Sequence, residues 1–298
     1  MTANRLTVKG DRTLLNGQSF LAKGLRCSNA LIREAATREL IANLETFKSF
    51  GINTISAFFM GSRFGDCQGY NRDGTLSAPH ALRLGRIIEA ADALGMVVVV
   101  GCLYWGATRG KWEEWTQAEA NTAVAETVRW LADHDYMNTL VDVDNEGMAL
   151  AQAGFDNRAL VLAGKAIDPD CVIATNFKGD PPPEADLGIH FAHPVAGKPY
   201  IETEGSPENT PGGYWGAYSK EEGVYAYLRV GEYTEAMKES QKTIAAQHLD
   251  RGWGYMLAST WLQAAPPQGP NHRPGGYGGP TDPGVRWWLE WLRERYGA

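Results

Sequence analysis

The stretch at residues 82–105, LRLGRIIEAADALGMVVVVGCLYW, holds a helical pattern followed at once by a strand pattern. Its first half has apolar residues at helical spacing, at Leu84, Ile87, Ile88 and Ala91. Gly95 follows where a helix ends in a left-handed residue. The run MVVVVGCLYW is so rich in β-branched residues that it indicates a strand buried on both faces. A helix joined to such a strand is the unit of an α/β fold.

The same unit recurs along the chain. Apolar stripes predict further helices around residues 40–47, 124–131, 159–167 and 285–292, and a long helix is expected around residues 235–249. Short apolar runs predict further strands at residues 19–27, 52–59, 140–146, 171–176, 187–194, 199–205 and 254–262. The connections after 171–176 and 187–194 are too short for full helices. Eight strands with helical crossovers predict a closed (β/α)8 barrel, or TIM barrel.

We expect residues 1–298 to form one such α/β domain, because no stretch reads as an interdomain linker. Segments 6–10 and 12–20 predict an N-terminal β-hairpin that closes the barrel bottom. Stretches rich in proline and glycine predict long loops after strands three, seven and eight. The alternative is an open doubly wound sheet. That fold favours a glycine-rich phosphate turn after its first strand, and KGLRCSN offers a single glycine.

Composition narrows the range of partners. The chain of 298 residues is 44% hydrophobic and 21% charged, enough to bury a large core. Its formal charge of −7 disfavours nucleic acid and anionic membranes, so a neutral substrate fits better. We find no apolar run that could span a bilayer and no signal peptide. As written, the chain is expected to be cytoplasmic, or secreted if a leader has been lost.

The cysteines suggest no special chemistry. Cys27, Cys67, Cys102 and Cys171 stand far apart, without the CxxC spacing of zinc or redox sites. We expect free, mostly buried thiols. The sequence predicts no cofactor and no metal centre, and it leaves the oligomeric state open.

Two predicted strands end in glutamate. They are LVDVDNEG at residues 140–147, which contains Glu146, and KPYIETEG at 198–205, which contains Glu204. In one barrel the carboxyl ends of both strands meet at the same rim. Two carboxyl groups there are the equipment of a retaining glycosidase, which works through a covalent intermediate. Since side chains alternate along a strand, both Asn145 and Glu146 reach the pocket only if the strand ends or bulges there.

The strand at 199–205 offers two candidates for the nucleophile. Glu202 and Glu204 are two residues apart and are expected to point the same way. Glu204 is nearer the carboxyl end, and Gly205 after it leaves backbone room for a sugar, so Glu204 is the better nucleophile. Glu202 is expected to lie one layer deeper, where it could tune its partner's pKa or pair with Arg26 or a histidine.

With these residues the chain resembles the clan A glycoside hydrolases over nearly its whole length. Their strand four typically ends in Asn-Glu, matched by Asn145 and Glu146, and their strand seven often reads K-P-x-x-x-T-E-x-G, similar to KPYIETEG. Strand six often reads His-x-Tyr, where this chain has HFAHP with His190 and His193. The tryptophan of strand eight is matched by Trp261. The arginine of strand two is missing from INTISAFF, and Arg26 is its expected substitute.

The resemblance implies a mechanism. Glu146 is the acid/base, Glu204 the nucleophile, and Asn145 binds the 2-hydroxyl of the sugar. For retention the carboxyl groups should lie about 5–5.5 Å apart. Aromatic residues near the expected mouth predict sugar platforms. They are Tyr104, Trp105, Trp112, Trp115, Tyr214, Trp215, Tyr218 and Trp261.

Two other readings remain open. A metal-dependent hydrolase or isomerase barrel could use Asp142, Asp144, Glu146, His190 and His193. Against it, the odd separation of the two histidines turns them to opposite faces of a strand. A barrel that binds saccharide without cleaving it is also possible, and the intact glutamate pair argues against it.

Overall fold

The computed structural model describes residues 2–60, 67–105, 114–205, 233–258 and 285–297, together with the backbone of two short paired strands, β11 (Tyr218–Ser219) and β12 (Val224–Tyr225). Eight parallel strands form a closed barrel in the order β10-β13-β4-β5-β6-β7-β8-β9. The barrel predicted from the sequence is therefore confirmed. Its strands are β4 (Lys23–Leu25), β5 (Thr54–Phe58), β6 (Val97–Leu103), β7 (Thr139–Asp144), β8 (Ile173–Thr175), β9 (Leu187–Ile189), β10 (Tyr200–Gly205) and β13 (Gly254–Leu257).

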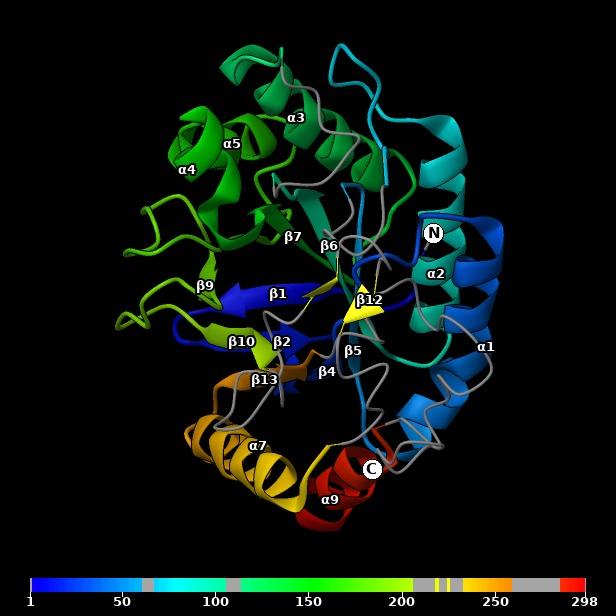
Figure 1. Ribbon diagram of the computed structural model, residues 1–298. Coiled ribbons are helices and arrows are strands. Elements are labelled where there is room, and N and C mark those ends of the chain that lie inside the picture. The colour runs from blue at the N-terminus through cyan, green and yellow to red at the C-terminus, as the bar shows by residue number, and fades with distance from the viewer. Residues whose placement is uncertain are drawn as a thin grey trace.

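Helices surround the barrel (Figure 1). They are α1 (Glu34–Ser49), α2 (Ala78–Asp92), α3 (Gln117–Asp133), α4 (Met148–Ala153), α5 (Asn157–Lys165), α7 (Glu235–Leu249) and α9 (Arg286–Tyr296). The predicted apolar stripes of α1, α2, α3 and α9 face the barrel. The stripe predicted for α5 is wrong, because Leu162 is exposed and the buried apolar residues are Leu160 and Val161. The short helix α4 was not predicted. The connections between β8, β9 and β10, all of them described, contain no helix, as expected from their length.

Strand β6 shows why the sequence specifies this barrel. All seven of its residues are buried. Val97 and Val99 pack into the core inside the barrel, while Val98 and Val100 pack into the outer core beneath the helices. A strand between two apolar layers has no polar face, which accounts for its unbroken apolar run.

The predicted N-terminal hairpin is confirmed, and a third strand extends it to a three-stranded sheet. Strands β1 (Leu6–Lys9), β2 (Arg12–Leu15) and β3 (Gln18–Phe20) pair antiparallel in that order. The predicted first barrel strand, 19–27, therefore splits into β3 and β4. Asn16 and Gly17, both with positive φ, make the turn between β2 and β3, and Asn-Gly is a signal for a two-residue hairpin.

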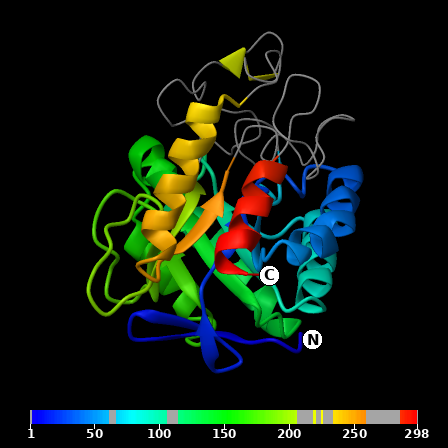
Figure 2. The same ribbon diagram turned by 90° about the horizontal axis from the view of Figure 1, so that it is seen from below.

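This sheet closes one end of the barrel. Leu6 belongs to the core inside the barrel, and Val8, Leu15 and Phe20 pack against it. In Figure 2 the arrow of β13 points away from the end of the barrel that this sheet covers. The amino ends of the strands are thus covered, which leaves the opposite, carboxyl end for the site.

Other expectations can be placed as well. The four cysteines are free, three of them buried, as expected. Among the described residues, no helix has the length and apolar character needed to cross a membrane. The loops predicted after strands three, seven and eight lie largely outside the described residues. That the whole chain forms one domain stays a prediction.

Candidate active site

Strand β7 carries acidic side chains into the barrel and then ends abruptly. A short 3-10 turn, Asn145–Gly147, follows it, and Glu146 has the left-handed φ of 55°. Gly147 is also left-handed, and a Cβ there would lie 2.7 Å from the Cβ of Phe177. The turn breaks the alternation of the strand, so Asn145 and Glu146 both turn toward the site. A left-handed non-glycine residue is strained, and such strain is common at functional sites.

The two aspartates of β7 have other partners. Asp144 accepts hydrogen bonds from the backbone N–H groups of Ala149 and Leu150, at 2.9 and 3.1 Å, and so fixes the start of α4. Asp142 accepts from the amide of Asn176 at 3.1 Å. Burial raises the pKa of Asp142 to about 6 and that of Asp144 to about 7, against these hydrogen bonds.

Strand β10 positions the second glutamate through a bulge. Its register against β13 gains one residue between Glu202 and Gly205. The carboxylate of Glu202 turns back and accepts the backbone N–H of Glu204 at 2.8 Å. Gly205 is required for packing, because a Cβ there would lie 1.7 Å from the hydroxyl of Tyr255. That it also leaves room for a sugar stays a prediction.

Arg26, at the end of β4, reaches the same point. Its guanidinium lies 3.4 Å from Oε2 of Glu204, with both side chains about 1% exposed. It also donates to Oδ1 of Asn145 at 2.5 Å and lies over the ring of Phe58, 4.8 Å from the ring centre. A buried cation so placed offsets part of the cost of burying Glu204.

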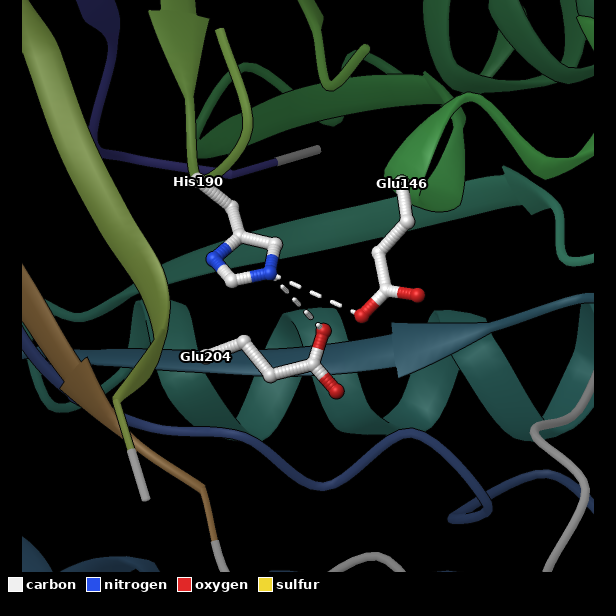
Figure 3. Close-up of side chains that lie close together, drawn as sticks. All are labelled: Glu146, His190 and Glu204. Atoms are coloured by element: carbon white, nitrogen blue, oxygen red, sulfur yellow. Dashed lines mark ion pairs between the residues drawn. The ribbon is translucent and has the colours of Figure 1, made fainter. Parts of the chain in front are cut away.

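His190 lies between the two glutamates (Figure 3). Its Nε2 is 3.6 Å from Oε1 of Glu146 and 3.8 Å from Oε2 of Glu204. Its Nδ1 lies 2.6 Å from Oε1 of Glu202. Of the two arrangements open to Glu202, pairing with a histidine is therefore the one observed.

The carboxyl groups of Glu146 and Glu204 form a close, interacting pair. An oxygen of each lies within 4.8 Å of the other and of a His190 nitrogen. Burial raises the pKa of Glu204 to about 7, and the negative charge of Glu146 adds to this effect while Arg26 opposes it. For Glu146 burial acts to raise the pKa, but the nearby His190, at 3.6 Å, and the positive charge of Arg26 outweigh it, so the pKa is lowered. In the free protein, below about pH 7, the proton of this pair thus lies mainly on Glu204.

The other predicted contact residues fall into three groups. Tyr104 is buried, with its ring edge against Phe58, and Trp105 is buried against Trp115 and Phe155. His193 is not near the glutamates: it is exposed and pairs with Asp180. The third group lies outside the described residues and consists of Trp112, Tyr214, Trp215 and Trp261, with Tyr218 described by its backbone alone.

The five-residue metal set does not come together. Asp144 is engaged by α4 and His193 by Asp180. Within the described residues, the side chains that could hold a cation are Glu146, His190 and Glu204. A metal there would have to displace the proton of His190, whose pKa is raised to about 10 by Glu202 and Glu146 although burial acts to lower it.

Sequence reasoning missed one member of the site. Asn176 follows β8 and donates to Asp142 and to Oδ1 of Asn145, at 3.1 and 3.2 Å. Its position as the last residue of the strand pattern CVIATN was the available signal, since residues at the carboxyl ends of barrel strands build the site. Asn176 and Arg26 together occupy Oδ1 of Asn145.

Comparison with known proteins gives the fold a context. No family model matches the sequence, and no curated protein matches it either. Solved structures do match. A glycoside hydrolase family 5 mannosidase from Rhizomucor miehei is 11% identical, with 97% of each chain covered and a TM-score of 0.60.

Two further structures give the same result. A β-1,4-D-mannanase from Cryptopygus antarcticus is 11% identical over 95% of this chain and 100% of its own, with a TM-score of 0.56. A glycoside hydrolase family 5 protein from Bacteroides vulgatus is 14% identical over 96% of this chain and 68% of its own, with a TM-score of 0.58. At these identities the likeness shows the fold: the chain shares the (β/α)8 barrel of these structures.

Proposed function

We propose that this chain is a retaining glycoside hydrolase, with Glu146 as acid/base and Glu204 as nucleophile. The observation that carries the proposal is the close pair of carboxyl groups at the carboxyl end of a closed barrel. Retaining enzymes hold their two carboxyl groups about 5–5.5 Å apart, while inverting enzymes leave about 6.5–9.5 Å for a water molecule. The 4.8 Å limit on the separation of two Glu146 and Glu204 oxygens favours retention.

The reaction follows in two steps. Glu204 attacks the anomeric carbon, the bond from that carbon to the glycosidic oxygen breaks, and Glu146 gives its proton to the departing oxygen. Glu146, now ionised, then removes a proton from water. The water oxygen bonds to the anomeric carbon, the ester to Glu204 breaks, and both carboxyl groups return to their starting forms.

Substrate binding supplies the proton in the right place. In the free protein the shared proton lies mainly on Glu204, whereas the first step needs it on Glu146. The side chain of Glu146 is 18% exposed and that of Glu204 1%. A sugar in the site would therefore desolvate Glu146 much more than Glu204, and so would raise the pKa of Glu146 and draw the proton to it.

Asn145 is suited to hold a sugar hydroxyl. Its Oδ1 is taken by Arg26 and Asn176, which leaves Nδ2 as the free end of the amide. This Nδ2 is buried and has no hydrogen-bond partner among the described residues. A buried donor without a partner is costly, and a sugar oxygen would satisfy it.

Trapping of the intermediate tests the proposal. The protein is incubated with activated 2-deoxy-2-fluoro glycosides, beginning with β-mannosides and β-glucosides because fold neighbours are named for mannan and glucan cleavage. Intact mass and peptide mapping then locate the label. A label on Glu204 supports the proposal, and a label on Glu146 or Glu202 contradicts the assignment of the nucleophile. No label from any sugar, together with activity lost in chelator, would contradict the retaining mechanism itself.

A further inference from the structure

Glu202 and His190 form a partly buried dyad next to the proposed catalytic pair. The Nδ1–H of His190 donates to Oε1 of Glu202 at 2.6 Å, and the side chains are 12% and 15% exposed. The hydroxyl of Tyr200 donates to the backbone carbonyl of His190 at 2.6 Å and lies 3.4 Å from Oε2 of Glu202. Both side chains are thereby fixed by partners that do not belong to the catalytic pair.

The backbone also holds His190 in place. Its φ is 46°, an unusual conformation for a non-glycine residue. Its ring stacks on that of Phe191, with ring centres 4.3 Å apart. These constraints point Nε2 toward Glu146 and Glu204, as Figure 3 shows.

The groups around this ring are mostly acidic. Glu202 and Glu204 face it from β10, Glu146 from the turn after β7, and Asp142 from within β7. The positive charge near Glu204 comes from Arg26. Although burial acts to lower the pKa of His190, these carboxylates raise it to about 10. A neutral imidazole that donates its Nδ1–H to Glu202 has no proton on Nε2, the atom that faces the catalytic pair. An imidazolium has a proton on that nitrogen as well.

We infer that Glu202 is a positioning residue that keeps His190 as an imidazolium, and that this imidazolium is the counter-ion of whichever catalytic glutamate is ionised. The inference rests on the proposed function. Before the first step the negative charge is on Glu204, and after it Glu204 is a neutral ester and Glu146 carries the charge. Nε2 lies at nearly equal distances from both, 3.6 and 3.8 Å, so one fixed cation serves both stages.

Charge is conserved across the step. With the sugar bound, Arg26 and His190 carry two positive charges, and Glu202 and Glu204 carry two negative ones. When the glycosidic bond breaks, Glu146 loses its proton to the leaving oxygen and Glu204 loses its charge to the new bond. The cluster of five residues again has two cations and two anions, so the protein need not move a charge to meet the change.

Histidine NMR tests the charge directly. We expect the imidazole nitrogen shifts of His190 to show an imidazolium at pH 8 in the wild type and a neutral ring in Glu202→Gln. Glu202→Asp, which keeps the carboxylate, should restore the imidazolium. His190→Asn identifies the His190 signal, because only that signal is lost in this variant. The chain has six histidines, and the signals of the other five report whether each variant is folded. An imidazolium in Glu202→Gln at pH 8 would overturn the inference.

Kinetics test the consequence. The ratio of kcat/KM for Glu202→Gln to that for wild type should fall by ~10-fold or more between pH 5 and pH 8, because without Glu202, the largest of the effects that raise its pKa, His190 loses its proton within this range. Glu202→Asp should show a smaller fall. Glu184→Gln removes a carboxylate that pairs with Arg158 on the surface and should leave the ratio constant.

The two proposals fail in different ways. A ratio for Glu202→Gln that stays constant with pH overturns the counter-ion role alone, even if overall activity falls. Absence of turnover and of labelling for every glycoside overturns the proposed function and with it the counter-ion role. The NMR experiment still decides whether Glu202 holds the charge on His190, since it needs no substrate.

Discussion

At the scale of single residues, Glu146 and Glu204 differ in what surrounds them, and rescue by azide can tell their roles apart. Glu204→Ala should lower kcat/KM at least ~10³-fold, since it removes the group that bonds to the sugar. Azide, which fits the space left, should restore turnover and give a glycosyl azide of inverted configuration. Glu146→Ala should cost ~10²–10⁴-fold on substrates with poor leaving groups and little on activated ones, because only the former need a proton.

The Glu146→Ala variant supplies the control. With Glu146→Ala, azide should attack the intermediate on Glu204 and give the retained glycosyl azide. The configuration of each product is read by NMR. Retained azide from Glu204→Ala together with inverted azide from Glu146→Ala would exchange the two roles. That outcome would agree with the free protein holding its proton mainly on Glu204.

The residues of this site were partly predictable. Glu146, Glu204 and Arg26 follow strand patterns, and the rule that barrel sites form at carboxyl ends of strands is enough to group them. The position of His190 between the glutamates was not predictable, because it depends on a left-handed backbone and on the carboxylate of Glu202. For the same reason His193 could not be excluded, although it faces Asp180.

At the scale of elements, the bulge of β10 links packing to the site. Gly205 ends the strand and lies against Tyr255, which is buried and hydrogen-bonded to Gln241 of α7. Gly205→Ala would place a Cβ 1.7 Å from the Tyr255 hydroxyl. We expect a loss of about 1–3 kcal/mol in the free energy of unfolding, as for overpacked cores, and a loss of activity because the bulge carries Glu204. Thermal unfolding and kcat/KM are measured together.

Gly10→Ala separates the two effects. Gly10 has a φ of 61°, and a Cβ there would meet no atom within 4 Å. This variant should lose stability through backbone strain alone, in the N-terminal sheet far from the site. Its kcat/KM should equal that of the wild type. Full activity in Gly205→Ala would show that the bulge does not position Glu204.

Elements were predicted where a single physical rule governs them. Helix α7 has the predicted bounds. Strand β6 has the predicted burial, because its unbroken run of β-branched residues is typical of a strand between two apolar layers. The segment 19–27 was misread as one strand, since its apolar pattern continues from β3 to β4 while the backbone turns between two sheets. The bulge in β10 depends on the fit of Tyr255, and no local pattern reports such a contact.

At the scale of the whole molecule, the buried charges of the site should govern how stability depends on pH. The pKa values of Asp142, Asp144 and Glu204 are raised to about 6, 7 and 7. Between pH 4 and 7, roughly, the folded state then holds protons that the unfolded state has lost, so stability falls as pH rises. The pKa of His190 is raised to about 10, so its contribution is complete below its ordinary value and is lost as pH rises through 10.

Carboxylates with lowered pKa act in the opposite direction at the acid end. Glu146 and Glu202 owe their lowered pKa to His190, against burial, and their contribution is lost as they take up protons below their ordinary pKa. Together these shifts place maximum stability at about pH 5, and the free energy of unfolding should decline from there toward about pH 9. Urea unfolding at pH 5, 7 and 9 measures the free energy of unfolding along this range.

Replacing Glu204 with a neutral residue tests whether its ionisation causes this dependence of stability on pH. Glu204→Gln keeps an oxygen for Arg26 but cannot ionise, so its free energy of unfolding should fall less between pH 5 and pH 7 than that of the wild type. By pH 7 the variant should therefore have gained stability relative to the wild type, because the wild type must then bury an ionised carboxylate. A wild type that gains stability from pH 5 to 9, or an unchanged slope in the variant, would show that these groups are solvated at little cost. The site would then lack the strained electrostatics that make one proton pass between two glutamates.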